Sequence, residues 1–329
     1  MGVITLNLSQ NEWFLRYQKP INYLVVVVSL FFLSLSPIIV RYAQAERVPS
    51  ILIAGSRMIL ASLLITPIVV RYYASQLRAI TRADVFLLAL TGIWMSANGI
   101  LVIISLEHIP VLTNQMLAST APIWAALIEV TWLKARLHPL IWVGIGLVVT
   151  GSLLITILQA DGGNTDVSLL GVVLALLSAI CGAIYTAIGR RVRPKVSILP
   201  YLWVVYGVGG IFALSIVLLT QVQVFGYSAS GYAWIGASTI LVQLLGFSGM
   251  AYALAFFPAT VIVLSTRAVA IPASIFAFLL FSEVPTWIQV IGSVILFAGI
   301  ISAIVGQEVA DYRAKAFARN LQGTHHDSA

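Results

Sequence analysis

Charged residues are scarce in this chain. Asp, Glu, Lys and Arg together make up 9% of its 329 residues, whereas 60% are hydrophobic. A soluble globule of this length needs far more polar material to cover its surface. The shortage excludes a soluble domain and predicts an all-helical integral membrane protein that has the lipid bilayer as a partner.

Cysteine is rarer still. The single cysteine, Cys181, lies inside an apolar stretch, which leaves neither a disulfide framework nor a cysteine metal site. No G-x-x-x-x-G-K-[ST] phosphate loop occurs, so nucleotide hydrolysis by this chain is not expected. The net charge of +7 is scattered over loop flanks and is not gathered on one face, which argues against nucleic acid as a partner. We expect no cofactor and no metal.

Apolar stretches near the spanning length of about 20 residues recur along the chain. They predict ten transmembrane helices, at about 21–40, 51–73, 85–106, 110–133, 140–158, 169–189, 199–220, 232–256, 258–281 and 287–305. The loops between them are short. Residues 1–20 form a polar flank, and residues 306–329 form a polar tail that we expect to be mobile.

The basic residues predict the orientation of these helices. If the N-terminus is cytoplasmic, the cytoplasmic segments hold fourteen of the eighteen Lys and Arg residues and the outer segments hold two. This bias is a strong positive-inside signal and places both termini in the cytoplasm. The remaining two cations, Arg57 and Arg267, lie within predicted helices.

An internal duplication is visible at a shift of 148 positions. The shift relates Pro110 to Pro258, Gly144 to Gly292 and Gly151 to Gly299 on matching apolar segments. The chain thus divides into a first five-helix repeat (21–158) and a second (159–305). Because five is odd, the second repeat enters the bilayer from the opposite side, and the two repeats are expected to be inverted.

Several short motifs carry a family resemblance. They are Ala54-Gly55-Ser56-Arg57, Ser119-Thr120-Ala121-Pro122, Trp142-Val143-Gly144 with Gly151, and Ser282-Glu283 with Gly292 and Gly299. With the inverted duplication, they make the chain resemble the EamA-type branch of the drug/metabolite transporter superfamily over residues 21–305. Ala135 departs from the pattern, since the family often has a glutamate there. The resemblance implies a carrier of small metabolites, amino acids or drugs that often exports them.

The sequence therefore predicts a secondary transporter, with no catalytic residues, in the inner membrane of a bacterium. It would be a monomer or a homodimer that works by alternating access about a cavity near the midplane. Substrate, direction and coupling ion stay open. A channel or a lipid-handling membrane protein is the alternative, although neither charge rings nor a carbonyl filter is visible.

Arg267 is the leading candidate for substrate binding. A cation near the bilayer centre is costly and is expected to face protein, water or substrate. Its counterpart in the first repeat is the neutral Ser119, so packing symmetry does not require a cation there. The other proposed substrate contacts are polar or aromatic residues at membrane depth: Trp94, Asn98, Ser119, Trp124, Tyr185 and Gln243. A structural arginine satisfied by helix-end carbonyls or a glutamate is the competing interpretation of Arg267.

Three further charged residues are structural or coupling candidates. Arg57 lies two turns from the outer end of its helix, where it can snorkel or pair with Glu107. Glu129 lies near the cytoplasmic end of its helix, where it either titrates during transport or serves as an interfacial glutamate. Glu107 and Glu129 are thus candidates for proton coupling.

One motif suggests an enzyme. Gly246-Phe247-Ser248-Gly249 resembles the serine motif of rhomboid proteases, in which a histidine on a later membrane helix activates the serine. None of the four histidines lies in a later span, so Ser248 has no base. An intramembrane hydrolase is the remote alternative, and we interpret the motif as a packing site.

Overall fold

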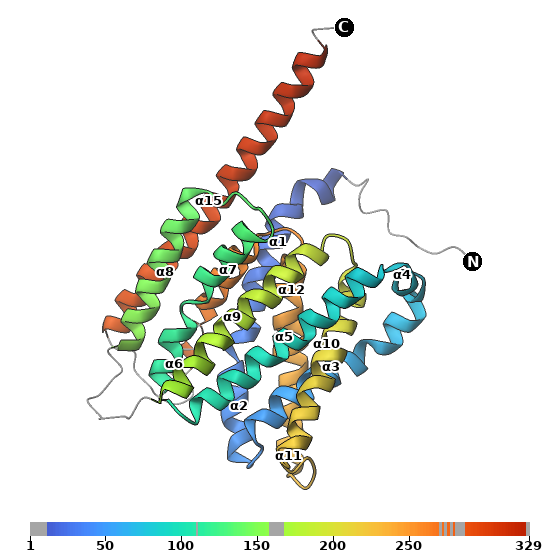
Figure 1. Cartoon of the computed structure of the whole chain (residues 1–329), viewed down its shortest axis with the longest axis vertical. Coiled ribbons are helices and arrows are strands. Elements are labelled where there is room, and N and C mark those ends of the chain that lie inside the picture. The colour runs from blue at the N-terminus through green and yellow to red at the C-terminus, as the bar shows by residue number, and fades with distance from the viewer. Residues whose placement is uncertain are drawn as a thin grey trace.

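The computed structural model describes residues 12–109, 111–157, 168–269, 272, 275–276, 279 and 287–326. Within these residues all regular secondary structure is helical (Figure 1). Helices satisfy their own backbone hydrogen bonds, which is required of lipid-exposed segments. Large apolar side chains such as Leu63, Leu170 and Ile211 are exposed on the surface, as expected of faces that contact lipid.

The first half contains eight helical elements. They are α1 (Glu12–Ser34), α2 (Ser36–Ala45), α3 (Ser50–Tyr72), α4 (Ala74–Ala79), α5 (Arg82–Leu106), α6 (Val111–Ala118), α7 (Ala121–Thr131) and α8 (Pro139–Ile157). α1 and α2 together form one apolar span, Lys19–Ala45. The start of α5 is capped, because the Thr81 hydroxyl accepts a hydrogen bond from the backbone N–H of Asp84.

The second half repeats this plan. Its described elements are α9 (Leu169–Val192), α10 (Ile198–Leu219), α11 (Ala229–Ala237), the π-helix η2 (Ser238–Phe247), α12 (Ser248–Ala253), α13 (Ala259–Thr266), the 3-10 turn η3 (Arg267–Val269) and α15 (Trp287–His326). α11, η2 and α12 form one continuous apolar span, Ala229–Ala253.

Among the described residues, seven helices are long and apolar enough to cross a membrane, and two shorter ones cover Pro139–Leu154 and Ala259–Val269. The predicted all-helical membrane fold is confirmed. The count of ten spans remains a prediction, because the end of the fifth helix and much of the ninth lie outside the described residues.

Two predicted helices are broken near their middles. The helix expected over 110–133 divides into α6 and α7, and the one expected over 258–281 bends into η3 at Arg267. Pro122 and Pro272 explain the breaks, because each lacks the N–H that would bond four residues back, to Ala118 and Ala268. Continuity through these positions was thus wrongly predicted.

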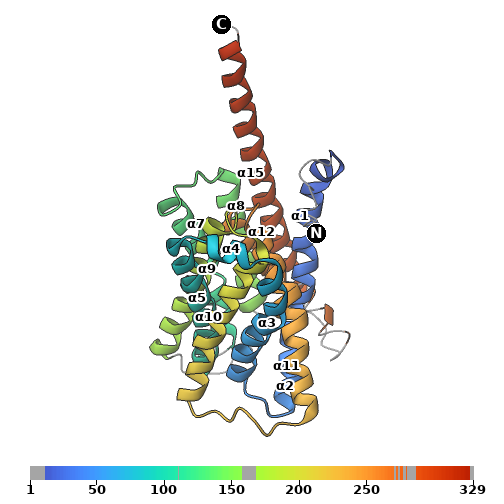
Figure 2. The same cartoon turned by 90° about the vertical axis from the view of Figure 1, so that its right-hand side faces the viewer.

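The C-terminal tail continues the last helix of the bundle. α15 continues for 40 residues and projects well beyond the bundle (Figures 1 and 2). Where it leaves the bundle it is attached to α1, because Glu308 forms an ion pair with Lys19 and accepts a hydrogen bond of 2.8 Å from the Tyr23 hydroxyl. The tail is helical as far as His326.

The two halves meet through helices that are counterparts of each other. In the α8–α15 pair, a Cβ on Gly144 would lie 2.6 Å from the carbonyl oxygen of Gly299, and one on Gly151 would lie 2.6 Å from that of Gly292. The 148-residue shift converts the first contact into the second. The pair is antiparallel, as an inverted duplication requires.

The α3–α10 pair has the same property. Gly210 packs against the backbone of Ile59, and Gly207 packs against Ser62. The shift takes Ile59 to Gly207 and Ser62 to Gly210, so these contacts are also images of each other. Both counterpart pairs allow the backbones to approach closely at glycine, as small residues do in membrane helices.

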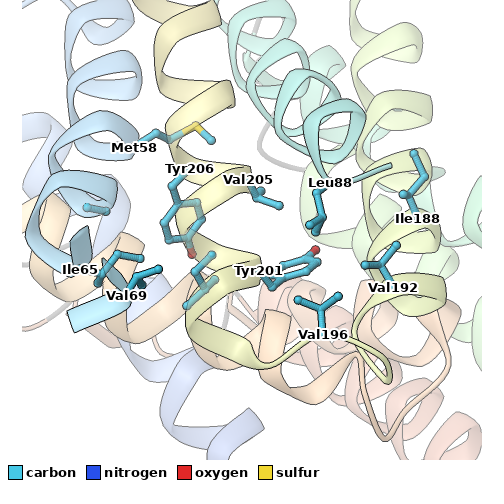
Figure 3. Close-up of a cluster of buried hydrophobic side chains, with 12 residues drawn as sticks. Met58, Ile65, Val69, Leu88, Ile188, Val192, Val196, Tyr201, Val205 and Tyr206 are labelled. Atoms are coloured by element: carbon cyan, nitrogen blue, oxygen red, sulfur yellow. The ribbon is translucent and has the colours of Figure 1, made fainter. Parts of the chain in front are cut away.

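The largest buried cluster joins α3, α5, α9 and α10. It includes Met58, Leu88 and Val192 together with two tyrosines, Tyr201 and Tyr206 (Figure 3). Both tyrosine side chains also border a cavity. Tyr201 and Tyr206 thus belong to both the core and the cavity wall, and their packing in the core fixes the positions of their hydroxyl groups.

Candidate functional site

A cavity of about 360 Å³ lies between the two halves. Its wall includes residues of α3, α5 and α6 from the first half, and of α9, α10, α12 and η3 from the second. The described lining residues with polar side chains are Ser36, Arg57, Asn98, Asn114, Gln115, Ser178, Tyr185, Thr186, Tyr201, Tyr206, Thr266 and Arg267.

Arg267 reaches this cavity from a broken helix. It caps the C-terminal end of α13, and its backbone N–H bonds to the carbonyls of Leu264 and Ser265. Its guanidinium Nε is fully buried and has no hydrogen-bond partner among the described residues. A discontinuous membrane helix at a central cavity is a recurring way to build a transport site. The prediction that Arg267 faces a cavity is thereby supported, whereas its binding role stays a prediction.

Arg57 reaches the same cavity from the other half. Its guanidinium carbon lies 5.3 Å from the centre of the Phe247 ring, and its Nε is buried without a hydrogen-bond partner in the described part of the chain. Glu107, the proposed partner, is exposed in the turn after α5, and no ion pair joins it to Arg57 among the described residues. Arg57 lines the cavity, whereas the sequence predicted that it would snorkel or pair with Glu107 near the outer end of its helix.

Tyr185 lines the cavity and interacts electrostatically with both arginines. It is near enough to both guanidinium groups for each to act on its hydroxyl. Asn98, the third predicted residue that lines the cavity, has its side-chain Nδ2 committed to α9, donating to the carbonyl oxygen of Ser178 at 2.8 Å. Its amide oxygen is the group left to face a ligand.

Four predicted contact residues are not among those that line the cavity. Trp94 packs against the large buried cluster, and Trp124 packs beside α9 and donates to the Thr120 hydroxyl at 3.2 Å. Ser119 is buried at the α6–α7 break and donates to the carbonyl of Met116 at 2.6 Å. Gln243 is buried within η2. Whether these four residues contact substrate stays a prediction.

Glu129 has a structural partner on α13. Its Oε1 accepts the backbone N–H of Ala259 at 3.0 Å, and its Oε2 accepts the N–H and the hydroxyl of Thr260 at 3.0 and 2.6 Å. The carboxylate is 2% exposed, so it is a buried cap and not an interfacial side chain. The negative charge and the hydrogen bonds of Glu129 both stabilise the N-terminal end of α13.

The opposite side of the same turn is held by α9. Arg190 donates from Nη1 to the carbonyls of Leu254 and Ala255, at 3.0 and 2.9 Å, and Arg193 donates from Nε to that of Ala251 at 2.9 Å. Two arginines thus bind the carbonyl end of α12 while Glu129 binds the N–H end of α13. The turn between α12 and α13 is thus held at both ends.

Ser248 is in a packing environment. Its hydroxyl donates to the backbone carbonyl of Gln243 at 3.1 Å and lies 3.1 Å from the Tyr206 hydroxyl. The glycines on either side pack tightly against α1, Gly246 against Leu33 and Gly249 against Ser29. These contacts support the interpretation of the motif as a helix-packing site.

The model of the EamA-like transporter family matches residues 20–157 and again residues 169–305. The chain belongs to this family. The two matches coincide with the two halves of the structure, so the EamA-like chain consists of two EamA repeats, and the predicted family is confirmed. No curated protein sequence matches the chain.

A solved crystal structure shares the fold of this EamA-like chain. It superposes with a TM-score of 0.72 at 15% sequence identity, over 88% of this chain and 98% of the other. At that identity the likeness shows the arrangement of the helices and nothing of the substrate.

The sequence did not identify Arg57 or Tyr206 as members of the cavity. One signal was present: Arg57 has Val205 as its counterpart at the 148-residue shift, and both residues line the cavity. An inverted duplication brings counterparts of cavity residues to the same cavity. Applied to Arg267 the rule fails, because Ser119 is withdrawn into the helix break.

Proposed function

We propose that this EamA-like chain is a secondary transporter that exports a small anionic metabolite by alternating access, with ten spans in two inverted five-helix repeats. Residues 21–158 and 159–305 are the repeats, and Arg267 is the principal substrate contact. The observation that supports this is a buried guanidinium at a break in a membrane helix, facing a cavity between the halves, whose Nε has no hydrogen-bond partner among the described residues. An anion supplies the partner that this group lacks.

The proposed orientation places residues 1–20 and 306–329, and therefore both termini, in the cytoplasm of a bacterium. Single cysteines in a Cys181→Ala background test this. Lys195→Cys lies at an exposed position in the turn between α9 and α10, and Gln223→Cys lies in the exposed loop before α11. An impermeant thiol reagent added to intact cells should label position 223 and leave position 195 unlabelled until the cells are opened. Labelling of position 195 in intact cells would refute the orientation.

Transport itself is tested in proteoliposomes. The purified full-length protein is reconstituted and screened with radiolabelled organic anions, amino acids and neutral metabolites for saturable uptake that is accelerated by the same compound inside. Arg267→Ala and Arg267→Lys are both expected to reduce uptake at least about tenfold, because Lys does not reproduce the bidentate fork. Arg71→Ala, an exposed arginine, is the control. Unimpaired transport by Arg267→Lys would exclude the fork, and uptake without trans-acceleration would indicate a channel.

A further inference from the structure

The described lining of the cavity contains two arginines. Arg57 comes from α3 in the first half and Arg267 from η3 in the second, and both line the same space. No aspartate or glutamate is present among the described residues of the lining. Glu129, the buried carboxylate at the start of α13, is committed to that helix by three hydrogen bonds. The two charges therefore have no acidic counterpart in the part of the wall that the structure describes.

Two like charges in one poorly solvated space repel each other, and each has lost hydration on burial. Hydroxyl and amide groups of Tyr185, Tyr206 and Asn98 supply dipoles there, but they do not neutralise charge. A ligand with a single negative charge would leave one guanidinium uncompensated. A ligand with two would neutralise both.

We propose that the substrate is a small dicarboxylate, with one carboxylate bound by Arg57 and the other by Arg267. This rests on the proposed transport function and names the substrate class of that site. Each guanidinium presents a planar fork that matches one carboxylate. Because the two forks belong to different halves, the ligand bridges the moving parts of the carrier.

The rest of the wall fits such a molecule. Met95, Val102 and Phe247 supply apolar surface suited to a short methylene spacer between the two carboxylates. An amino acid fits less well, because its ammonium group would meet two cations and no described carboxylate. The cavity volume of about 360 Å³ limits the substrate to a small metabolite.

The test measures binding to the full-length protein in detergent by titration calorimetry in chloride-free zwitterionic buffer. The probes are malonate, succinate, glutarate and adipate, each paired with its monomethyl ester, and aspartate, which adds an ammonium group to the succinate skeleton. We expect at least one dicarboxylate to bind about tenfold or more tightly than its own ester. We expect aspartate to bind about tenfold or more weakly than succinate. The chain length that binds best reports the spacing of the two forks.

Arg57→Gln separates this proposal from the general function. It should reduce the ratio of diacid to ester affinity to within about twofold, because only Arg267 is left to bind a carboxylate. Arg267→Gln should also abolish the diacid preference, and as a variant of the principal contact it should weaken the ester as well. Arg71→Gln, on the same helix as Arg57 but exposed, should change neither affinity.

Each outcome decides a different point. If the wild-type protein binds diacids and esters within about twofold, binds aspartate as well as succinate, or binds none of the diacids, the dicarboxylate proposal is overturned. If Arg57→Gln keeps the full preference, the role of Arg57 is overturned. The wild-type measurements test the dicarboxylate proposal even if the Arg57→Gln variant fails to fold. If monoanions are transported through Arg267 while diacids are not preferred, the proposed function survives and this inference does not.

Discussion

The side-chain oxygen Oε2 of Glu129 accepts the hydroxyl of Thr260 at 2.6 Å, which joins the fourth span of the first half to the start of the broken helix that carries Arg267. Two backbone N–H groups of α13 bind the same carboxylate. Glu129 has Ala277 as its counterpart at the 148-residue shift, so the duplication does not repeat this cap. The helix that carries Arg267 is thus anchored asymmetrically.

Glu129→Ala is expected to destabilise the protein by about 1–3 kcal/mol, because it leaves buried donors of Ala259 and Thr260 without an acceptor. The measurement is unfolding in mixed micelles with increasing denaturing detergent. Glu107→Ala is the control, since Glu107 is exposed, and it should change stability by less than about 0.5 kcal/mol. Equal effects of the two substitutions would show that the cap contributes nothing.

Gly151→Ala is expected to loosen the α8–α15 pair. The added Cβ would lie 2.6 Å from both the carbonyl oxygen of Gly292 and the backbone nitrogen of Leu296, neither of which can move alone. Overpacking of this kind costs about 1–3 kcal/mol. Gly146→Ala, on the same helix with nothing within 4 Å of the new Cβ, should be neutral or slightly stabilising. Thermal unfolding of the two variants in detergent compares them directly, and a Gly151→Ala protein as stable as Gly146→Ala would contradict the packing argument.

Gln243→Met is expected to stabilise the protein. Both side-chain amide atoms of Gln243 are buried without a hydrogen-bond partner in the described part of the chain, so an apolar side chain of similar size removes a desolvation cost of about 1–3 kcal/mol. The Tyr206 and Ser248 hydroxyls bind its backbone carbonyl and are unaffected. Unfolding and transport are measured together. A stable variant that no longer transports would instead support the sequence prediction that this amide contacts substrate.

The loop contact between Glu46 and Ser228 is expected to depend on pH. Ser228 donates to the Glu46 carboxylate at 2.6 Å, and this hydrogen bond, with a smaller effect of Ser230, lowers the pKa of Glu46. A depressed carboxyl pKa contributes stability above the unfolded value of about 4.3, and this stability is lost as the pH falls through the lower folded pKa. Hydrogen exchange at the start of α11, corrected for intrinsic rates, should accelerate below about pH 4. Glu46→Gln should abolish this pH dependence, and an unchanged profile would contradict it.

Much of the fold could be predicted from the sequence, because hydrophobic length and the 148-residue shift locate the helices and relate the halves. Even the helix breaks had a signal in Pro122 and Pro272. Their effect was missed because a proline within a membrane helix can also be accommodated by a kink alone. The apolar run by itself does not distinguish these outcomes.

The site was less predictable, because cavity lining depends on how each helix is rotated against its neighbours. Arg57 was expected near the outer surface from its distance to the helix end, yet the packing of α3 against α10 and η2 turns it inward. Gln243 was expected in the cavity, but it lies in a π-helix, whose wider turn changes the direction of the side chains. The position of Arg267 at the cavity was predictable, because a cation at membrane depth is expected to face protein, water or substrate and not lipid.

The counterpart pairs α3–α10 and α8–α15 have a consequence for a single half. Each contact is the image of another in the same pair, so the interface is isologous in form. A chain of residues 1–158 alone would carry the α8 glycines for such a contact with a copy inserted upside down. It would lack the glycines of the other pair, because Gly207 and Gly210 have Ile59 and Ser62 as their counterparts. Two copies inserted the same way would leave Gly144 and Gly151 facing lipid, without the partner backbone that both residues are shaped to meet.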